Sequence, residues 1–528
     1  MKIRMLSVIA AVVFGVSAAD AGSIQLTLQW SGTTALVPPT STVGGEPLTN
    51  NEFDLSMLSG DVADGGGNSL GPQPLVNRPI FRGRAVGGSA GAGANRAKSN
   101  PQLQLSFDGL NFHDHRFANN GNQFSSEPPD QGLCVGNGFV VESVNTVLSI
   151  YDPSGTRLLA PVDLNTFYGY PAEINRSNGA VGPMLTDPSC YYDADTQRWF
   201  HVVLTLDRVG TTDNLAGTNH LDIAVSKSAD PRGPWNIYRL PVQNNGTQGT
   251  PDHKCALGFC LGDYPHIGAD ANAFFITTNE FSVFGPGFYG AQIYAISKRA
   301  LAAGAPAVNV VLWNTADPSS PTFGFTVWPA ISPNSQYKTD NGGTEYLLSS
   351  DAVFAANGVS NEIWVWSVTN TSLIDTAPQA LVLNASAVGV KPYAVPTSRI
   401  AQKPGNTPLR DCVADPACAP LLGVPVTNYP APRSLAHNDS RMQQVMYANG
   451  KLWGALDTDV LQDGGVHGSG VAYFVLNPAS GVMFANDTLA LPDASLSYPA
   501  LAVTPSGRGV ITFTLAGPND YPSAGYAG

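Results

Sequence analysis

Short apolar runs that open with an X-Pro pair recur along most of this chain, and they restrict its fold more than any other feature. The openings are Asp187-Pro188-Ser189-Cys190, Tyr264-Pro265-His266-Ile267, Trp328-Pro329-Ala330-Ile331 and Tyr498-Pro499-Ala500-Leu501. In each case a turn follows, and then a stronger run rich in Val, Ile, Tyr, Phe and Trp, which is the signature of a strand. The pattern therefore predicts a repeated antiparallel sheet unit.

Two further units keep this layout without the proline, so that six units begin near residues 130, 187, 263, 328, 439 and 498. A lone four-stranded sheet leaves two faces and two edges unprotected, whereas radial packing of such sheets buries both faces. We predict an all-β fold, a β-propeller of six or seven blades. Tandem β-sandwiches are the alternative, because their strands alternate in the same way.

The sixth unit is short, and its last predicted strand stops at Gly528. A ring of sheets must be completed, since an open ring exposes strand edges. The short unit therefore indicates either a truncated sequence or closure of the ring by an N-terminal strand.

Composition agrees with sheets and excludes other classes. The chain has 55 Gly and 41 Pro among 528 residues and only 13% charged residues, which argues against long helices. Hydrophobic residues make up 43%, which argues against global disorder. The formal net charge of −13 disfavours a broad phosphate-binding face, so we expect no nucleic-acid partner.

The N-terminus is typical of an export signal. Lys2 and Arg4 precede an apolar run from Met5 to Val16, and Ala19-Asp20-Ala21 fits the small-residue cleavage rule. We predict a signal peptide over residues 1–21 and a secreted protein, either periplasmic or extracellular. The apolar run is too short to span a membrane and no later run is long enough, so we expect no membrane insertion.

Residues 22–126 are rich in Gly, Ser and Asn. They predict a partly disordered leader with one or two strands, such as Ile24 to Trp30 and Leu103 to Phe107. The propeller is expected over residues 127–528, with its last blade incomplete.

Six cysteines in an exported chain favour disulfides over metal ligation. Two pairs close brief segments between predicted strands, Cys255 with Cys260 and Cys412 with Cys418, which leaves Cys134 with Cys190. A zinc site is disfavoured because the chain has no C-x-x-C pair.

Several motifs resemble those of exported bacterial β-propeller proteins and, more loosely, of sialidase-like and five-bladed glycosidase propellers. They are Pro128-Pro129-Asp130-Gln131-Gly132, Asp187-Pro188 with Tyr192-Asp193 and Arg198-Trp199, and the box-like segment from Ser228 to Trp235. The resemblance covers about Pro128 to the C-terminus and implies the propeller fold. The chain has one such box and no assignable arginine triad, so we expect no sialidase activity. In the box, Asp230 should accept backbone N–H bonds and Trp235 should pack between strands.

Acidic residues recur just before the first strand of successive units. Asp130, Asp187 and Asp263 stand at this position, and Asp439 is a fourth candidate. In a propeller they would gather at one end of the central tunnel, where mutual repulsion raises the pKa of one carboxyl and suits it to general acid catalysis. Glu280, after a strong predicted strand, is the expected acid of a glycosidase pair. The alternative is that each Asp caps its own turn.

Aromatic residues near the expected tunnel mouth could stack on sugar rings. These candidates for substrate binding are Tyr264, Phe281, Tyr289 and Trp328, together with His266; the alternative is that they belong to the sheet core. Ca²⁺ is an open alternative at the acidic ring, and we expect no other cofactor. The pair His113 and His115, with His266 as a third ligand, could hold a metal, but solvated histidines in a polar leader are the better interpretation.

Together these features predict a secreted propeller that binds an extracellular glycan or similar polymer at one end of its tunnel. One alternative is a glycoside hydrolase or polysaccharide lyase that uses Asp130, Asp187, Asp263 and Glu280. Another is a non-catalytic scaffold for protein interaction or adhesion, whose long insertion between residues 384 and 437 contacts a partner.

Overall fold

The computed structural model describes residues 22–36, 84–85, 103–124, 129–376, 380–403 and 435–528. The expected signal peptide and the pair Cys412 and Cys418 lie outside these residues. Within them, no helix is long and apolar enough to cross a membrane.

Six antiparallel units follow one another in the described chain, close to the predicted starts, and we call them blades 1 to 6. Blade 1 comprises β3 (Gln131–Gly136), β4 (Phe139–Val144), β5 (Val147–Tyr151) and β6 (Arg157–Asp163). Blade 2 comprises β9 (Met184–Asp193), β10 (Arg198–Arg208), β11 (Leu215–Ser226) and β12 (Pro234–Pro241). Blade 3 comprises β13 (Cys260–Ala269), β14 (Ala273–Ser282), β15 (Phe288–Ser297) and β16 (Ala307–Asn314). Blade 4 comprises β17 (Trp328–Ile331), β18 (Thr344–Ser350), β19 (Val359–Thr369) and β20 (Val382–Ala394). Blade 5 comprises β21 (Met442–Ala448), β22 (Lys451–Leu461), β23 (His467–Leu476) and β24 (Met483–Ala490). Blade 6 comprises β25 (Ser495–Val503), β26 (Gly509–Gly517) and β27 (Asp520–Ala527).

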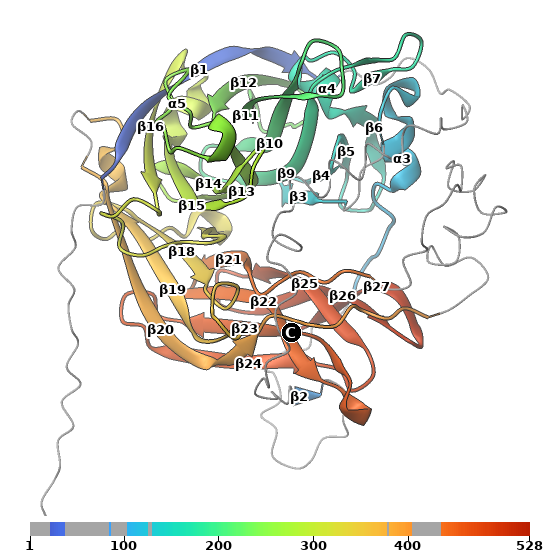
Figure 1. Ribbon diagram of the computed structural model, residues 1–528, viewed down its shortest axis with the longest axis vertical. Helices are drawn as coiled ribbons and strands as arrows, with labels where there is room; N and C mark the ends of the chain where they lie inside the picture. Colours follow the sequence, from blue (N-terminus) through green and yellow to red (C-terminus); the bar gives the residue numbers. More distant parts are fainter. Residues whose placement is uncertain (1–21, 37–83, 86–102, 125–128, 377–379, 404–434) are drawn as a thin grey trace, which may run out of the picture.

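The remaining elements connect or flank the blades. They are the strands β1 (Ile24–Ala35), β2 (Arg84–Ala85), β7 (Ile174–Asn175) and β8 (Ala180–Val181), the helices α3 (Phe112–Phe117), α4 (Leu164–Tyr168) and α5 (Lys298–Ala303), and the 3-10 turns η1 (Ala118–Gly121), η2 (Ala256–Gly258), η3 (Pro333–Ser335), η4 (Thr371–Leu373) and η5 (Asp463–Gly465). Helix α3 lies beside β6 (Figure 1).

Each middle strand buries apolar side chains on both of its faces. In β10, Phe200 and Val202 pack into the cluster shared with blade 3, while Trp199 and Val203 pack into the cluster shared with blade 1. Similar clusters lie between blades 3 and 4, 4 and 5, and 5 and 6. A sandwich sheet buries one face only, so this two-sided burial distinguishes the propeller from its alternative.

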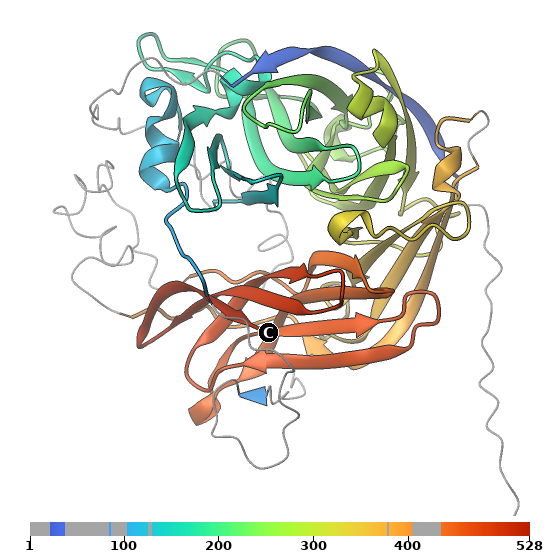
Figure 2. The ribbon, with the colours of Figure 1, turned by 180° about the vertical axis from the view of Figure 1, so that it is seen from behind.

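The innermost strands of consecutive blades lie side by side, from β3 through β9, β13, β17 and β21 to β25. Figures 1 and 2 show the six sheets following one another around an arc, with blades 1 and 6 at its two ends. The predicted propeller is thus confirmed, with six blades in the described residues.

Neighbouring blades are joined in two different ways. The strand β1 pairs with β12 and with β16, so it ties the outer edges of blades 2 and 3 into one sheet. Blades 4 and 5 are joined at their inner edges, where β17 pairs in parallel with β21.

The N-terminal segment differs from the expected leader. The predicted strand over Ile24 to Trp30 exists within β1, but it is part of the propeller, because Leu28 is buried between blades 2 and 3. The predicted strand over Leu103 to Phe107 is wrong: these residues form no strand and their side chains are exposed. The closing N-terminal strand is also not found in the described residues, since β1 and β2 pair in other blades.

Two of the predicted disulfides are confirmed. Cys134–Cys190 links the inner strands β3 and β9 of blades 1 and 2, and Cys255–Cys260 closes the segment before β13. The box-like segment also has its predicted structural role. The carboxylate of Asp230 accepts the backbone N–H of Arg232 at 2.9 Å, and Trp235 is fully buried.

Removing these disulfides should destabilise the protein to different degrees. The separation in sequence is 56 residues for Cys134–Cys190 and 5 for Cys255–Cys260, and the loop-closure entropy grows with loop length. We expect the free energy of unfolding to fall by about 4 kcal/mol in Cys134→Ala/Cys190→Ala and by about 2 kcal/mol in Cys255→Ala/Cys260→Ala. Urea unfolding of both variants measures this, and equal losses would contradict it.

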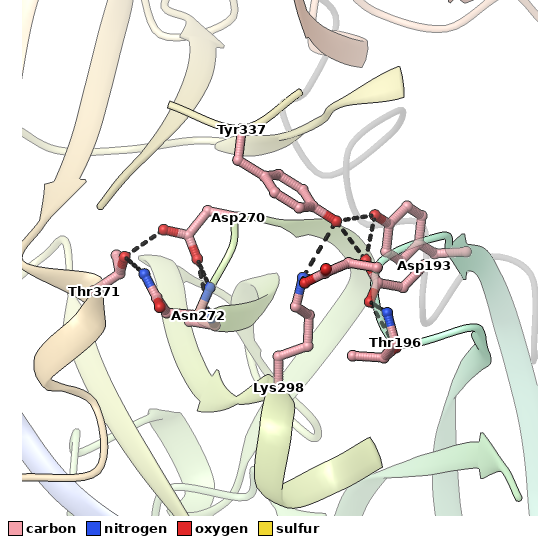
Figure 3. A network of polar contacts seen from close by, with 10 residues as sticks. Asp193, Thr196, Asp270, Asn272, Lys298, Tyr337 and Thr371 are labelled. Carbon is pink, nitrogen blue, oxygen red and sulfur yellow. Dashed lines mark hydrogen bonds and ion pairs between the residues drawn. The ribbon is translucent and has the colours of Figure 1, made fainter. Parts of the chain in front are cut away.

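A buried ion pair holds three blades together where their inner strands end (Figure 3). The ammonium of Lys298, at the start of α5, lies 3.2 Å from a carboxylate oxygen of Asp193, the last residue of β9, and 3.2 Å from the hydroxyl of Tyr337. Burial would raise the pKa of Asp193, but Lys298 and hydrogen bonds from Thr196 and Tyr337 lower it below its ordinary value. The carboxylate is therefore charged and fully enclosed, since the side chains of Lys298 and Asp193 are 1% and 0% exposed.

Replacing the lysine should be costly because it leaves a buried charge without its counter-ion. We expect Lys298→Met to lower the free energy of unfolding by about 3 to 5 kcal/mol. The matched control is Lys338→Met, which removes a solvent-exposed ion pair with Asp340 and should change stability by less than about 1 kcal/mol. Thermal or urea unfolding distinguishes the two, and a small effect of Lys298→Met would show that the pair is dispensable.

Candidate functional site

Three inner strands carry the same bulge at their X-Pro pair. In β9, Asp187 and Pro188 together face one residue of β10, and the pairs Tyr264-Pro265 of β13 and Tyr498-Pro499 of β25 repeat this arrangement. Proline has no N–H for the ladder, so a bulge accommodates it. The residue before the proline has a φ of 53° or 54° in all three cases, a left-handed backbone that costs about 1–2 kcal/mol for a residue with a side chain.

The bulged residues stand at matching levels around the propeller axis. Asp130, directly before β3, also has a positive φ, of 26°. The backbone of Gly132 lies against Pro188, and the hydroxyl of Ser189 donates to the carbonyl of Pro265 at 2.6 Å. The rings of Tyr264 and Trp328 are 6.4 Å apart. These contacts place the residues of blades 1 to 4 beside one another, and Tyr498 has the equivalent position in blade 6. We call this set in the first halves of the inner strands the axial ring: Asp130, Asp187, Tyr264, Trp328 and Tyr498.

The predicted carboxylates differ in their surroundings. Asp130 is partly exposed and Asp187 is 8% exposed, and the two stand on adjacent inner strands. Asp263 precedes the bulge residue Tyr264 and is 3% exposed. Asp130 and Asp187 therefore belong to the axial ring, whereas Asp263 stands one residue before the bulge position of its blade, opposite Asn279.

Glu280, the expected acid, has no exposed surface. Its carboxylate accepts hydrogen bonds from Asn244 at 2.5 Å, from His253 at 2.8 Å and from Gln292 at 3.2 Å. Burial raises its pKa, although His253 and Asn244 oppose this. Its contacts suit it to positioning the side chain of His253 rather than to meeting a substrate.

The predicted aromatic residues form a stack around His266. Its imidazole lies 3.7 Å from the Trp328 ring, nearly parallel to it, and 4.2 Å from the Tyr264 ring. His266 is 2% exposed, and burial together with the nearby charge of Arg441 lowers its pKa well below the ordinary value. The imidazole is therefore neutral, and its Nε2 atom has no hydrogen-bond partner. Tyr264 and Trp328 remain partly exposed.

Arg441 is a residue that the sequence reasoning missed. Its guanidinium donates to both carboxylate oxygens of Asp439, at 2.8 and 2.9 Å, and lies 5.6 Å from the centroid of the Tyr264 ring. Asp439 is thus engaged in an ion pair. The i, i+2 spacing of Asp and Arg before β21 was the only sequence signal for it.

The two remaining aromatic candidates have separate roles. The hydroxyl of Tyr289 accepts the backbone N–H of Ala256 at 2.8 Å, which ties it to the loop of the Cys255–Cys260 disulfide. Phe281 packs against Phe288, with ring centroids 5.2 Å apart, in a larger cluster of phenylalanines.

The expected solvated histidines need a correction. Residues 112–117 form α3 rather than a strand, and His115 is 2% exposed with its ring nitrogen 2.6 Å from the hydroxyl of Thr146. The helix packs on blade 1, so His115 is part of the structure there. Among the described residues, the one group of three potential ligands within 4.8 Å is Cys255, Cys260 and Glu280, but both sulfurs are in the disulfide. Calcium at the axial ring stays a prediction.

Polar side chains connect each blade to the entry of the next at the same end. Thr186 donates to Asn145 at 3.1 Å, Thr326 and Asn279 exchange two bonds of 2.8 Å, and Ser350 donates to the carbonyl of Ser440 at 2.5 Å. Between blades 2 and 3, the amide of Asn219 binds the backbone of Cys260 and Gly262. Between blades 5 and 6, the carboxyl group of Asp457 accepts from the Ser497 hydroxyl and from the Tyr498 N–H at 2.9 Å. These contacts hold the axial ring in place.

Asp457 should make stability depend on pH. Burial raises its pKa from 3.8 to about 8, against hydrogen bonds from Ser497, Tyr498 and Asn438. The folded state thus holds a proton on Asp457 that the unfolded state releases near pH 4. The contribution of this proton to the free energy of unfolding is fully present below pH 4 and is lost as the pH rises to about 8.

Between pH 5 and pH 8, we expect the free energy of unfolding of the wild type to fall by about 2 to 4 kcal/mol more than that of Asp457→Asn. The asparagine cannot ionise, so it removes the titration. Urea unfolding of both proteins at the two pH values measures the difference. Parallel pH profiles would show that Asp457 does not titrate in this range.

No protein-family model matches the chain, and no curated protein matches it either. Among solved structures, an α-L-arabinanase from Penicillium chrysogenum is 12% identical, with a TM-score of 0.34 over 76% of this chain and 93% of that chain. A sialidase from Streptococcus pneumoniae is 10% identical, with a TM-score of 0.33 over 75% and 66% of the two chains. An endo-arabinase from Bacteroides thetaiotaomicron is 14% identical, with a TM-score of 0.27 over 65% and 92%. Because these TM-scores are low, the propeller assignment rests on the strand pairing and burial described above.

Proposed function

We propose that this protein is exported and binds an extracellular glycan at the axial ring, without cleaving it. The observation that carries the proposal is the placement of two partly exposed aromatic rings, Tyr264 and Trp328, beside the acidic residues Asp130 and Asp187 on adjacent inner strands. Aromatic faces pack against the C–H faces of sugar rings, and carboxylates accept hydrogen bonds from sugar hydroxyls.

The backbone at the axial ring supports a binding role. Four residues of the described chain at this end of the inner strands, Asp130, Asp187, Tyr264 and Tyr498, have positive φ angles. Strained residues of this kind cluster at functional sites, where the surrounding structure holds them in place. The polar contacts between successive blades supply that support, so the ring is organised before a ligand binds.

Two further groups fit the proposal. The neutral imidazole of His266 is buried and stacks on the Trp328 ring at 3.7 Å, so it holds that ring in place rather than contacting a ligand itself. Arg441 is neutralised by Asp439, while Asp130 and Asp187 add negative charge. An uncharged glycan therefore fits this ring better than an acidic one.

The hydrolase alternative loses the acid that the sequence favours for it. Glu280 is fully enclosed and binds three donors of the protein, and Asp263 is 3% exposed, which leaves only Asp130 and Asp187 of its four named residues. A general acid must reach the leaving-group oxygen, so binding without cleavage is the function that these positions favour. Export is supported by the N-terminal pattern and by the two disulfides, which persist in oxidising compartments.

Affinity electrophoresis with soluble uncharged polysaccharides, such as linear arabinan, laminarin and galactomannan, tests the proposal. We expect retardation of the wild type by at least one of them, and a loss of affinity of about tenfold or more in Tyr264→Ala and in Trp328→Ala. Asp187→Asn should weaken binding by a smaller factor. The matched control is Tyr526→Ala, an exposed tyrosine of β27, which should bind like the wild type.

A reducing-end assay on the same polysaccharides separates binding from hydrolysis. We expect no release of reducing ends by the wild type. Release that disappears in Asp187→Asn would replace the binding proposal by the hydrolase alternative, and absence of retardation by every polysaccharide would overturn glycan binding. Thermal unfolding of each variant confirms that it is folded.

A further inference from the structure

Five phenylalanines form one continuous cluster on the side of the propeller where the axial ring lies. They come from the end of β14, the start of β15, the connection between β16 and β17, and the loop between β18 and β19: Phe281, Phe288, Phe323, Phe325 and Phe354. Neighbouring ring centroids are 5.1 to 5.8 Å apart. Phe325 is 3% exposed, whereas Phe323 and Phe354 are 48% and 44% exposed. The cluster thus has a buried base and an open outer edge.

The phenylalanine cluster is continuous with the axial ring through Arg441. The guanidinium lies 5.2 Å from the ring centroid of Phe325 and 5.6 Å from that of Tyr264. Phe325 in turn lies 5.1 Å from Phe354. The side chains of Arg441 and Phe325 are only 5% and 3% exposed, so the cluster and the axial ring are in contact below the surface, and the exposed edge of the cluster lies between blades 3 and 4.

The segments that carry the cluster have almost no charge. Residues 281–289, 315–327 and 351–358 contain no Lys or Arg, and their only charged residues are Asp317 and Asp351. The nearby Arg441 is already paired with Asp439, so phosphates, anionic lipids and acidic polysaccharides would meet the negative charge of these segments with no basic residue in them to offset it. The occupant that fits is uncharged and has apolar faces.

The exposed edge is too small for a stable contact with a second copy of the chain. Two phenylalanine rings that are about half exposed present roughly 200 Å², whereas a stable interface needs about 800 Å² from each partner. A single extended polysaccharide chain needs far less contact area for each of its sugar residues. The small, continuous and uncharged surface thus suits a chain that also occupies the axial ring.

We propose that the exposed edge of the phenylalanine cluster, Phe323 and Phe354, is an outer subsite for an uncharged polysaccharide whose inner residues lie at the axial ring. This inference rests on the proposed function and adds that the ligand is a long chain rather than a short oligosaccharide. The two rings pack against sugar faces beyond the residues that the axial ring holds.

The test compares a polysaccharide with a trisaccharide of the same linkage, for whichever polysaccharide retards the wild type. Affinity electrophoresis measures binding of the polymer, and calorimetric titration measures binding of the trisaccharide. For Phe323→Ala/Phe354→Ala we expect about tenfold weaker binding of the polymer and unchanged binding of the trisaccharide. Phe354→Leu, which keeps an apolar side chain without the flat ring, should show part of the loss.

The matched control is Phe284→Ala, because Phe284 is 44% exposed but contacts Phe259 rather than the cluster. It should bind both ligands like the wild type. Thermal unfolding of every variant shows whether it is folded.

Several outcomes would overturn the inference. Unchanged polymer binding in the double variant, with loss in Trp328→Ala, would reject the outer subsite and leave the proposed function intact. Equal loss of polymer and trisaccharide would place the two rings within the inner site. If the wild type binds neither ligand, the proposed function fails. Concentration-dependent self-association that the double variant abolishes would make the edge a contact between copies and would likewise reject the subsite.

Discussion

The structure depends on sheets that must bury both of their faces. Side chains that alternate along β10 enter two different clusters, one shared with blade 1 and one with blade 3. An isolated sheet of this kind would expose both apolar faces to water, which costs about 25 cal/mol for each Å². Stacking the sheets around an axis removes this exposure for all but the two outer faces of the arc. The same arrangement brings the inner strands together, and so it creates the axial ring.

The junctions between blades combine apolar packing with a few buried polar contacts near the axis. Asn279 and Asp457 lie on the second strand of their blades and Asn145 directly follows the second strand of blade 1, and each binds the segment that enters the next blade. Buried polar groups are favourable only when they are paired, so each contact fixes one relative position of two blades. At the other end of the inner strands, Lys298 and Asp193 fix blades 2 and 3 in the same manner. The X-Pro bulges are held between these two sets of contacts.

The candidate site follows from this arrangement. A bulge turns the residue before the proline out of the regular ladder in blades 2, 3 and 6, and Asp130 and Trp328 take the equivalent positions in blades 1 and 4. The side chains of the axial ring are of two kinds. They are acidic in blades 1 and 2 and aromatic in blades 3, 4 and 6. Arg441 packs between Tyr264 and Phe325, so the buried base of the phenylalanine cluster adjoins the axial ring. The proposed outer subsite is the exposed edge of that cluster, beyond this contact.

Much of this could be predicted from the sequence because it follows from local patterns. Alternating apolar runs and X-Pro openings specify strands and their order, and the starts of all six blades were predicted to within a few residues. The disulfides Cys134–Cys190 and Cys255–Cys260 followed from counting cysteines between predicted strands. The acidic and aromatic residues at Asp187 and Tyr264 were predicted to share one end of the propeller, because equivalent positions of repeated units lie at equivalent levels.

Only the tertiary structure decided what depends on contacts between distant segments. The sequence of β1 resembles any short strand, and its place between β12 and β16 is set by the apolar space that Leu28 fills. Glu280 follows a strong strand as expected, yet three side chains from elsewhere in the chain enclose it. The contacts of Arg441 with Tyr264 and Phe325, and the gathering of five phenylalanines into one cluster, have no local signature. Local periodicity determines which residues are strands, whereas burial and pairing across the blades determine which of their side chains a ligand can reach.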